Sequence, residues 1–173
     1  MLFRSKYLST TAERLTIRPY AVKENAKRWY IIAFCVERQG IRVYGLDRVT
    51  SLEITDTIFT MEKDFDIDAM FATSFGIYLP DGHGQKITFR TNHKEASYLR
   101  DLPIHGSQTE ESSDENGVTF SIFVSPANSK GEIYTDIIME FCKYGSRLEV
   151  LSPAFVRDQV RDEIARTLAL YSE

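Results

Sequence analysis

Hydrophobic and polar residues alternate with a period of two through much of the N-terminal part of the chain. Residues 14–21 follow this alternation cleanly, which is typical of a strand with one buried face. Residues 29–37 are apolar on both sides and predict a central strand, while residues 41–54 predict a long strand that bends near Gly45. Short strands joined by tight turns predict a small β-barrel over residues 1–57.

The pattern changes after residue 57. Apolar residues take a helical spacing over residues 65–75, and Gly76 suits the C-terminal end of such a helix. A cluster of turn-forming residues at 80–84 is typical of a boundary between domains. We therefore interpret residues 58–84 as a connector that contains one short helix.

Residues 85–173 alternate between strand and helix signals. Asn92 is expected to cap a helix whose third position is Glu95. The predicted order is a strand at 86–90, the helix after Asn92, strands at 106–113 and 117–125, a helix capped by Ser129 and Glu132, a strand at 147–151, and a helix after Pro153. This βαββαβ order with a terminal helix is the ferredoxin-like plan. The predicted fold class is thus α+β, a small barrel followed by a ferredoxin-like domain.

Length and composition agree with this division. A chain of 173 residues with 43% hydrophobic residues can fill one large core or two small ones. Its longest apolar run, residues 30–36, is too short to cross a bilayer, and no signal-peptide pattern opens the chain. Cys35 and Cys142 are too few for a disulfide framework. We expect a cytoplasmic protein with two buried free thiols and no membrane partner.

The net charge of -4 is unevenly distributed. Residues 1–60 contain ten Lys/Arg and six Asp/Glu, a balance of +4, which leaves eleven basic and nineteen acidic residues, a balance of -8, for the rest. A basic N-terminal module suits an anionic ligand, although ordinary variation between surfaces would give the same split.

Catalytic chemistry finds little support in the sequence. His83, His93 and His105 lack metal-ligand spacing, and neither cysteine pairs with them. No phosphate-binding glycine loop occurs, and the acidic residues at 64, 66 and 68 fit a helix cap better than a calcium loop. We therefore predict no enzyme activity, no catalytic residue, no metal and no cofactor.

Basic and aromatic residues of the N-terminal strands are the strongest candidates for a binding site. Arg42, Tyr44 and Arg48 share one side if their strand stays regular. Arg14, Arg18 and Tyr20 likewise share a side of another strand. Guanidinium groups bind phosphate through paired hydrogen bonds, and tyrosine rings stack on bases. The alternative interpretation is that the tyrosines pack in the core and the arginines form a solvated face.

These residues also resemble the WYL-domain proteins, a bacterial family named for a Trp-Tyr-Leu strand motif. The motif stands here as Trp29-Tyr30-Ile31, and residues 85–173 resemble the extension that follows the domain. Further matching landmarks are Tyr7-Leu8-Ser9, Pro19-Tyr20, Tyr44 to Arg48, His105 to Gln108, Tyr144-Gly145, Leu151 to Pro153, and Ala169 to Tyr171.

The resemblance implies an Sm-like or SH3-like barrel with a ferredoxin-like extension. It also implies the effector-sensing half of a transcriptional regulator, in which the barrel binds single-stranded nucleic acid or a nucleotide-like ligand. The ligand-binding residues that it implies are Tyr7, Ser9, Tyr20, Tyr30, Tyr44 and Arg48, to which we add Arg18 and Arg42 on chemical grounds. Trp29 is expected to pack in the core, because alternation points it away from Tyr30.

The resulting hypothesis is a homodimeric, ligand-sensing regulatory module. In this family a winged helix-turn-helix precedes the barrel, whereas this sequence begins in the first predicted strand. We expect either part of a longer regulator or a stand-alone sensor. The alternative function is an accessory protein that activates a separate nucleic-acid enzyme through contact.

Overall fold

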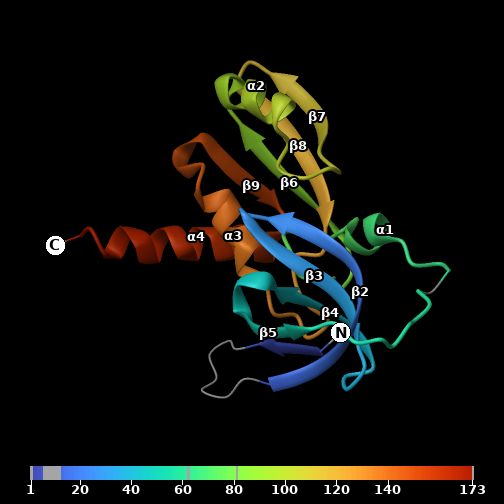
Figure 1. The fold of residues 1–173 in the computed structure, drawn as a ribbon. Coiled ribbons are helices and arrows are strands. Elements are labelled where there is room, and N and C mark those ends of the chain that lie inside the picture. The colour runs from blue at the N-terminus through green and yellow to red at the C-terminus, as the bar shows by residue number, and fades with distance from the viewer. Residues whose placement is uncertain (1, 6–12, 62, 81, 173) are drawn as a thin grey trace. The chain divides into compact units, whose positions relative to one another are not determined.

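The computed structural model describes residues 2–5, 13–61, 63–80 and 82–172. These form a mixed α+β protein with two compact units, one comprising Met1–Met70 and Gly76–Leu79, the other Phe71–Phe75 and Pro80–Glu173 (Figure 1). Tyr7 and Ser9, both predicted ligand-binding residues, lie outside the described residues.

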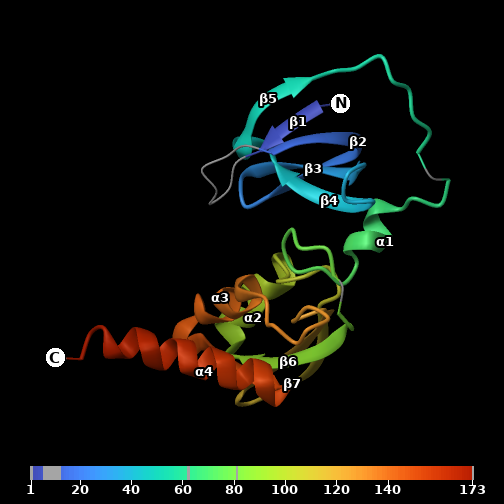
Figure 2. The same ribbon diagram turned by 90° about the horizontal axis from the view of Figure 1, so that it is seen from below.

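A five-stranded antiparallel sheet forms the N-terminal unit, in the order β4-β3-β2-β1-β5 (Figure 2). Its strands are β1 (Leu2–Ser5), β2 (Glu13–Asn25), β3 (Arg28–Cys35), β4 (Gly40–Gly45) and β5 (Val49–Glu53). Alternating side chains of β2 and β3 build the core of this unit: Leu15, Ile17, Ile31, Ala33 and Cys35. Ile32 is buried on the opposite face, so β3 is the central strand that its apolar sequence predicts.

The single long strand predicted over residues 41–54 is wrong. Two strands replace it, β4 and β5, with a 3-10 turn, η1 (Leu46–Arg48), between them. β4 pairs with β3 and β5 pairs with β1, so consecutive strands lie at opposite edges of the sheet. Since three residues join them, the sheet must curve strongly enough to bring its edges together.

The C-terminal unit contains a four-stranded antiparallel sheet in the order β7-β8-β6-β9. Its elements are β6 (Gln85–Thr91), α2 (His93–Asp101), β7 (Thr109–Asp114), β8 (Gly117–Val124), α3 (Thr135–Cys142), the 3-10 turn η2 (Gly145–Arg147), β9 (Leu148–Ser152) and α4 (Ala154–Ala169). All three α-helices pack on one sheet face, around a core in which the rings of Phe89, Phe120 and Phe141 meet. Cys142 is half-buried, so only Cys35 fits the prediction of buried thiols.

Of the two helix caps predicted in the C-terminal unit, one is confirmed and the other is wrong. Asn92 Oδ1 accepts a hydrogen bond from the Glu95 N–H at 2.8 Å, which confirms the predicted cap of α2. The Glu95 carboxylate instead binds Arg147, at 3.0 Å. The cap predicted at Ser129 is wrong, because α3 begins at Thr135. Residues 128–132 form a tight loop there, in which Asn128 Oδ1 accepts from two backbone N–H groups.

The helix of the connector, α1 (Ile67–Phe71), is shorter than predicted. It begins after Asp66, whose Oδ1 accepts from the N–H groups of Asp68 and Ala69, as the acidic sequence indicates. Residues 71–75 belong to the C-terminal unit, where the Ser125 N–H donates to the Thr73 carbonyl at 2.7 Å.

His105 binds this segment through a hydrogen bond that defines the tautomer of its imidazole ring. Its Nε2 lies 3.2 Å from the Ser74 carbonyl, which can only accept, so Nε2 carries the proton. Nδ1 is then free to accept from the Ser107 N–H at 3.1 Å. Burial lowers the pKa of His105, while the hydrogen bond to Ser74 acts in the opposite direction. The folded C-terminal unit therefore favours the neutral imidazole.

We expect the C-terminal unit to lose stability as the pH falls from about 6.5, the ordinary pKa of His, through the lowered folded pKa, because the unfolded chain binds the proton first. Urea unfolding at about pH 7.5 and about pH 5.5 measures this loss. His105→Gln is the control: its stability should vary less over this range than that of the wild type. An equal variation in both proteins would contradict the assignment.

Candidate ligand-binding face

The register of the N-terminal sheet decides which predicted site residues share a face. Directly opposed residues of an antiparallel pair point to the same side. Tyr30 is opposed by Lys23 on β2 and by Gly45 on β4, and Phe34 is opposed by Arg18 on β2. We call the side of β2, β3 and β4 that carries these residues the Tyr30 face: Arg18, Ala21, Lys23, Tyr30, Ile32, Phe34, Ile41, Val43 and Gly45.

Tyr30 and Arg48 both approach Gly45. A Cβ atom placed on this glycine would lie 3.6 Å from Tyr30 Cε1 and 3.7 Å from Arg48 Cδ. It would also lie 2.6 Å from Asp47 Oδ1, closer than a real Cβ allows. The absence of a side chain at Gly45 therefore leaves room for both the half-buried Tyr30 ring and the Arg48 stem next to this position. Sheet pairing supplies Tyr30, and the turn η1 supplies Arg48.

One acidic group lies next to this pair. Asp47 Oδ2 is 3.6 Å from Arg28 Nη1, which offsets part of its negative charge. Both side chains are largely exposed, so the ion pair contributes little to stability. Lys23, opposite Tyr30, adds a third basic residue to this end of the sheet.

Arg18 lies at the other end of the Tyr30 face. Its guanidinium carbon is 5.5 Å from the centre of the Phe34 ring, a cation–π distance. Phe34 and Tyr30 are four residues apart on one strand, so about 13 Å separates the two ends. The buried side chain of Ile32 lies between them. The face thus presents cations at both ends of a largely apolar strip.

Two predicted residues, Tyr44 and Arg42, point to the other side of the sheet. Tyr44 opposes Ile31, and its ring is 8% exposed within the core. Burial, together with a hydrogen bond to Cys35, raises the pKa of Tyr44. Arg42 opposes Ala33 and donates from Nη1 to the Ile41 carbonyl at 2.7 Å. For Tyr44 the alternative of core packing, left open by the sequence, is what the structure shows.

Tyr20 is also separated from the face. The register of β2 and β3 shifts between Pro19 and Ala21, which places Tyr20 in a bulge. Its ring packs edge-on against Phe65, with the ring centres 4.8 Å apart, and stacks on Phe59. The expectation that Trp29 packs in the core is wrong, since this residue is 53% exposed.

Lys23 and Gly45 were missed by sequence reasoning. The polar sequence from Lys23 to Lys27 is typical of a hairpin loop, whereas β2 continues to Asn25 and the turn uses Ala26 and Lys27, both with positive φ. The register that follows from a two-residue turn would have placed Lys23 opposite Tyr30.

Among the described residues, no three His, Cys, Asp or Glu side chains come together as metal ligands. No helix within the same ranges is long and apolar enough to span a membrane.

Comparison with known proteins identifies the N-terminal domain. Residues 2–54 match the family model of the WYL domain. Residues 2–54 of this chain thus form a WYL domain. The match covers the five strands of the N-terminal sheet, including Tyr30, Gly45 and Arg48.

Solved structures similar to this chain include two proteins, each longer than the chain itself. A CRISPR Cas-related protein is 15% identical with a TM-score of 0.56, over 98% of this chain and 46% of its own. The proteasome accessory factor B/C (PafBC) of Arthrobacter aurescens is 20% identical with a TM-score of 0.38, over 92% of this chain and 23% of its own. This chain therefore spans less than half the length of either. None of the curated proteins compared with it matches.

Proposed function

We propose that this WYL-domain protein is a ligand-sensing regulatory module whose Tyr30 face binds single-stranded nucleic acid or a nucleotide-like anion. The approach of Tyr30 and Arg48 to the same position, Gly45, carries this proposal. A guanidinium group binds phosphate through two parallel hydrogen bonds. A tyrosine ring can stack on any of the bases. One nucleotide presents both partners a short distance apart.

The distribution of cations supports a chain of nucleotides over an isolated anion. Arg48 and Lys23 lie at one end of the face and Arg18 at the other, about 13 Å away. A strand laid along β3 would place one of its phosphates near each end. Between them, the half-buried side chains of Ala21, Ile41 and Val43 offer apolar surface to bases, whereas Ile32 is buried.

We further propose an Sm-like or SH3-like barrel for the N-terminal sheet and a ferredoxin-like plan for the C-terminal unit. The connection of opposite sheet edges through η1 supports the first. The strand order β7-β8-β6-β9, with helices in both crossovers, supports the second. A cytoplasmic homodimer without catalytic activity that works with a winged helix-turn-helix domain completes the proposal.

Binding of labelled single-stranded oligonucleotides should weaken as salt rises from about 50 to about 200 mM. If Arg18, Lys23 and Arg48 each neutralise one phosphate, the logarithm of the association constant should fall with the logarithm of salt with a slope of about -2. Tyr30→Ala should weaken binding about 5- to 150-fold at unchanged slope, since it removes a stack. Arg48→Ala should reduce the slope by about 0.7. Fluorescence anisotropy measures all three.

Arg42→Ala is the matched control, because it removes the same charge from the opposite side of the same sheet. It should leave both affinity and salt slope close to those of the wild type. Affinity that ignores salt, or that survives Tyr30→Ala and Arg48→Ala unchanged, would remove the proposed site.

A further inference from the structure

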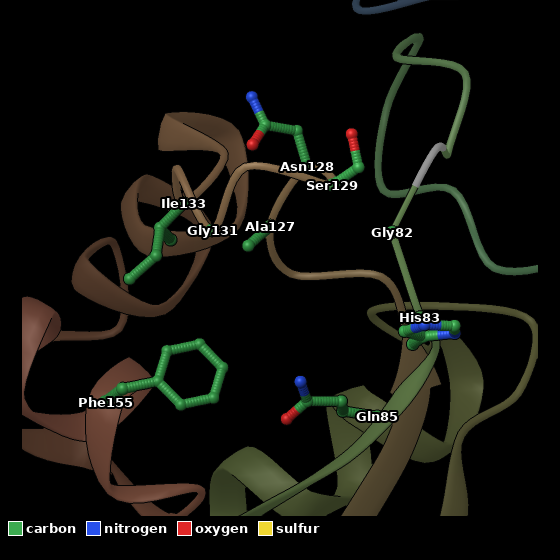
Figure 3. A pocket seen from close by; sticks show the side chains of 9 residues that line it. All are labelled: Gly82, His83, Gln85, Ala127, Asn128, Ser129, Gly131, Ile133 and Phe155. Atoms are coloured by element: carbon green, nitrogen blue, oxygen red, sulfur yellow. The ribbon is translucent and has the colours of Figure 1, made fainter.

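A cavity of about 490 Å³ opens within the C-terminal unit. This volume lies in the range of small-molecule sites. Figure 3 shows the Phe155 ring on one side and the Gln85 carboxamide facing it across the opening, with His83 at the edge. The lining residues are Gly82, His83, Gln85, Ala127, Asn128, Ser129, Gly131, Ile133 and Phe155.

Three elements fix the walls. Gln85 begins β6, Phe155 lies in the first turn of α4, and the bridge between Ala127 and Ile133 closes the loop above them. Asn128 holds this loop, since its Oδ1 accepts from the N–H groups of Lys130 and Glu132 at 2.9 and 3.0 Å.

Gly82 packs directly against the same loop. A Cβ atom at this position would lie 2.3 Å from the Ala127 carbonyl oxygen, so only glycine permits the approach. The Ser125 hydroxyl donates to the Gly82 carbonyl at 3.3 Å. The cavity is therefore a preformed feature of the unit, which lowers the entropic cost of binding.

The lining selects an uncharged ligand. It contains no acid, lysine or arginine, and its apolar part comes from Phe155, Ile133 and Ala127. The Gln85 carboxamide offers a donor and an acceptor in one plane and makes no hydrogen bond within the described ranges of the chain. Phe155 is 37% exposed, so its ring is accessible to a ligand that enters the cavity.

We propose that this cavity binds a small, uncharged, planar heteroaromatic ring with a hydrogen-bond donor beside an acceptor, such as a nucleobase. The ring would stack on Phe155, and the carboxamide of Gln85 would read its edge through two hydrogen bonds, the pairing by which glutamine recognises adenine. This site is separate from the Tyr30 face, needs no phosphate, and goes beyond the proposed function.

Titration of the whole chain with uncharged nucleosides, followed by nuclear magnetic resonance, tests the proposal. Saturable shifts are expected at residues 82–85 and 127–133, with an affinity that hardly changes with salt because no charge is neutralised. Phe155→Ala should weaken this binding about 5- to 150-fold. Gln85→Leu should reduce the preference among the bases. Tyr98→Ala, which removes an exposed ring from α2 in the same unit, should change nothing.

The ring can come from a free nucleoside or from one base of a longer strand. Shifts with both nucleosides and oligonucleotides would assign the site to the base itself, and shifts with oligonucleotides alone would assign it to a base held by its strand. The absence of saturable shifts at the cavity with either ligand would overturn the proposal. Unchanged affinity in a folded Phe155→Ala variant would also overturn it. Neither result would affect binding at Tyr30, which the salt titration reports independently.

Discussion

Phe120→Ala is expected to lower the free energy of unfolding of the C-terminal unit by about 3 to 5 kcal/mol. Phe120 is 1% exposed, and its ring centre lies 5.9 Å from that of Phe89, which in turn contacts Phe141 at 5.6 Å. Removing this ring from the middle of β8 leaves a cavity, which the three helices and the sheet cannot close without moving together. Urea unfolding, followed through resonances of this unit alone, measures the loss.

Phe123→Ala is the matched control on the same strand. Phe123 points to the other side of the sheet and is 48% exposed, so its truncation should cost less than about 1 kcal/mol. Equal losses in the two variants would mean that the face covered by the helices is not the main source of stability. If Phe120→Ala lowered the free energy of unfolding of the N-terminal unit by a comparable amount, the two units would unfold together.

The difference between these two phenylalanines could be predicted from the sequence. Val118, Phe120, Ile122 and Val124 alternate with other residues, and all four are buried in the same core. Alternation needs no knowledge of the partner strand, because the side-chain period of a strand is fixed by its backbone. The cap at Asn92 could be predicted for the same reason, since it depends on residues three positions apart.

The candidate site was harder to predict because it depends on pairing between strands. A bulge at Tyr20 and the turn η1 each interrupt the alternation, so counting by twos across them assigns the wrong side. The sequence correctly placed Arg42 and Tyr44 on one side, and pairing with Ile31 and Ala33 makes it the core side. Arg48 approaches Gly45 from the same side as Tyr30 only because the chain turns after this glycine.

The local sequence also does not determine which tyrosine rings are buried and which are exposed. A tyrosine in a buried row, such as Tyr44, looks the same in sequence as one that lines a binding face, such as Tyr30. Their exposure depends on what covers each side of the sheet, which is information carried by distant residues such as Leu15 and Ile17. Composition therefore predicted a basic, aromatic surface, but it could not predict which residues form that surface.

Gly117→Ala is expected to lower the free energy of unfolding of the C-terminal unit by about 2 to 5 kcal/mol, although it adds only one methyl group. Gly117 has a φ of 137°, a backbone conformation that residues with a side chain rarely adopt. A Cβ atom there would lie 2.3 Å from the Thr91 carbonyl oxygen. Because the obstacle is the backbone of β6, which pairs with β8 at this point, neither strand can yield without breaking the ladder. Urea unfolding measures the effect.

Gly106→Ala provides the control, since it adds the same methyl group in the same unit. A Cβ atom at Gly106 meets nothing within 4 Å, and its φ is outside the range that requires glycine. This variant should be neutral or slightly more stable, because alanine restricts the unfolded chain. If both variants unfolded at the same urea concentration, the close pairing of Gly117 with β6 would be wrong. The register that aligns Phe89 with Phe120 in the core would then be wrong too, because the same ladder sets both contacts.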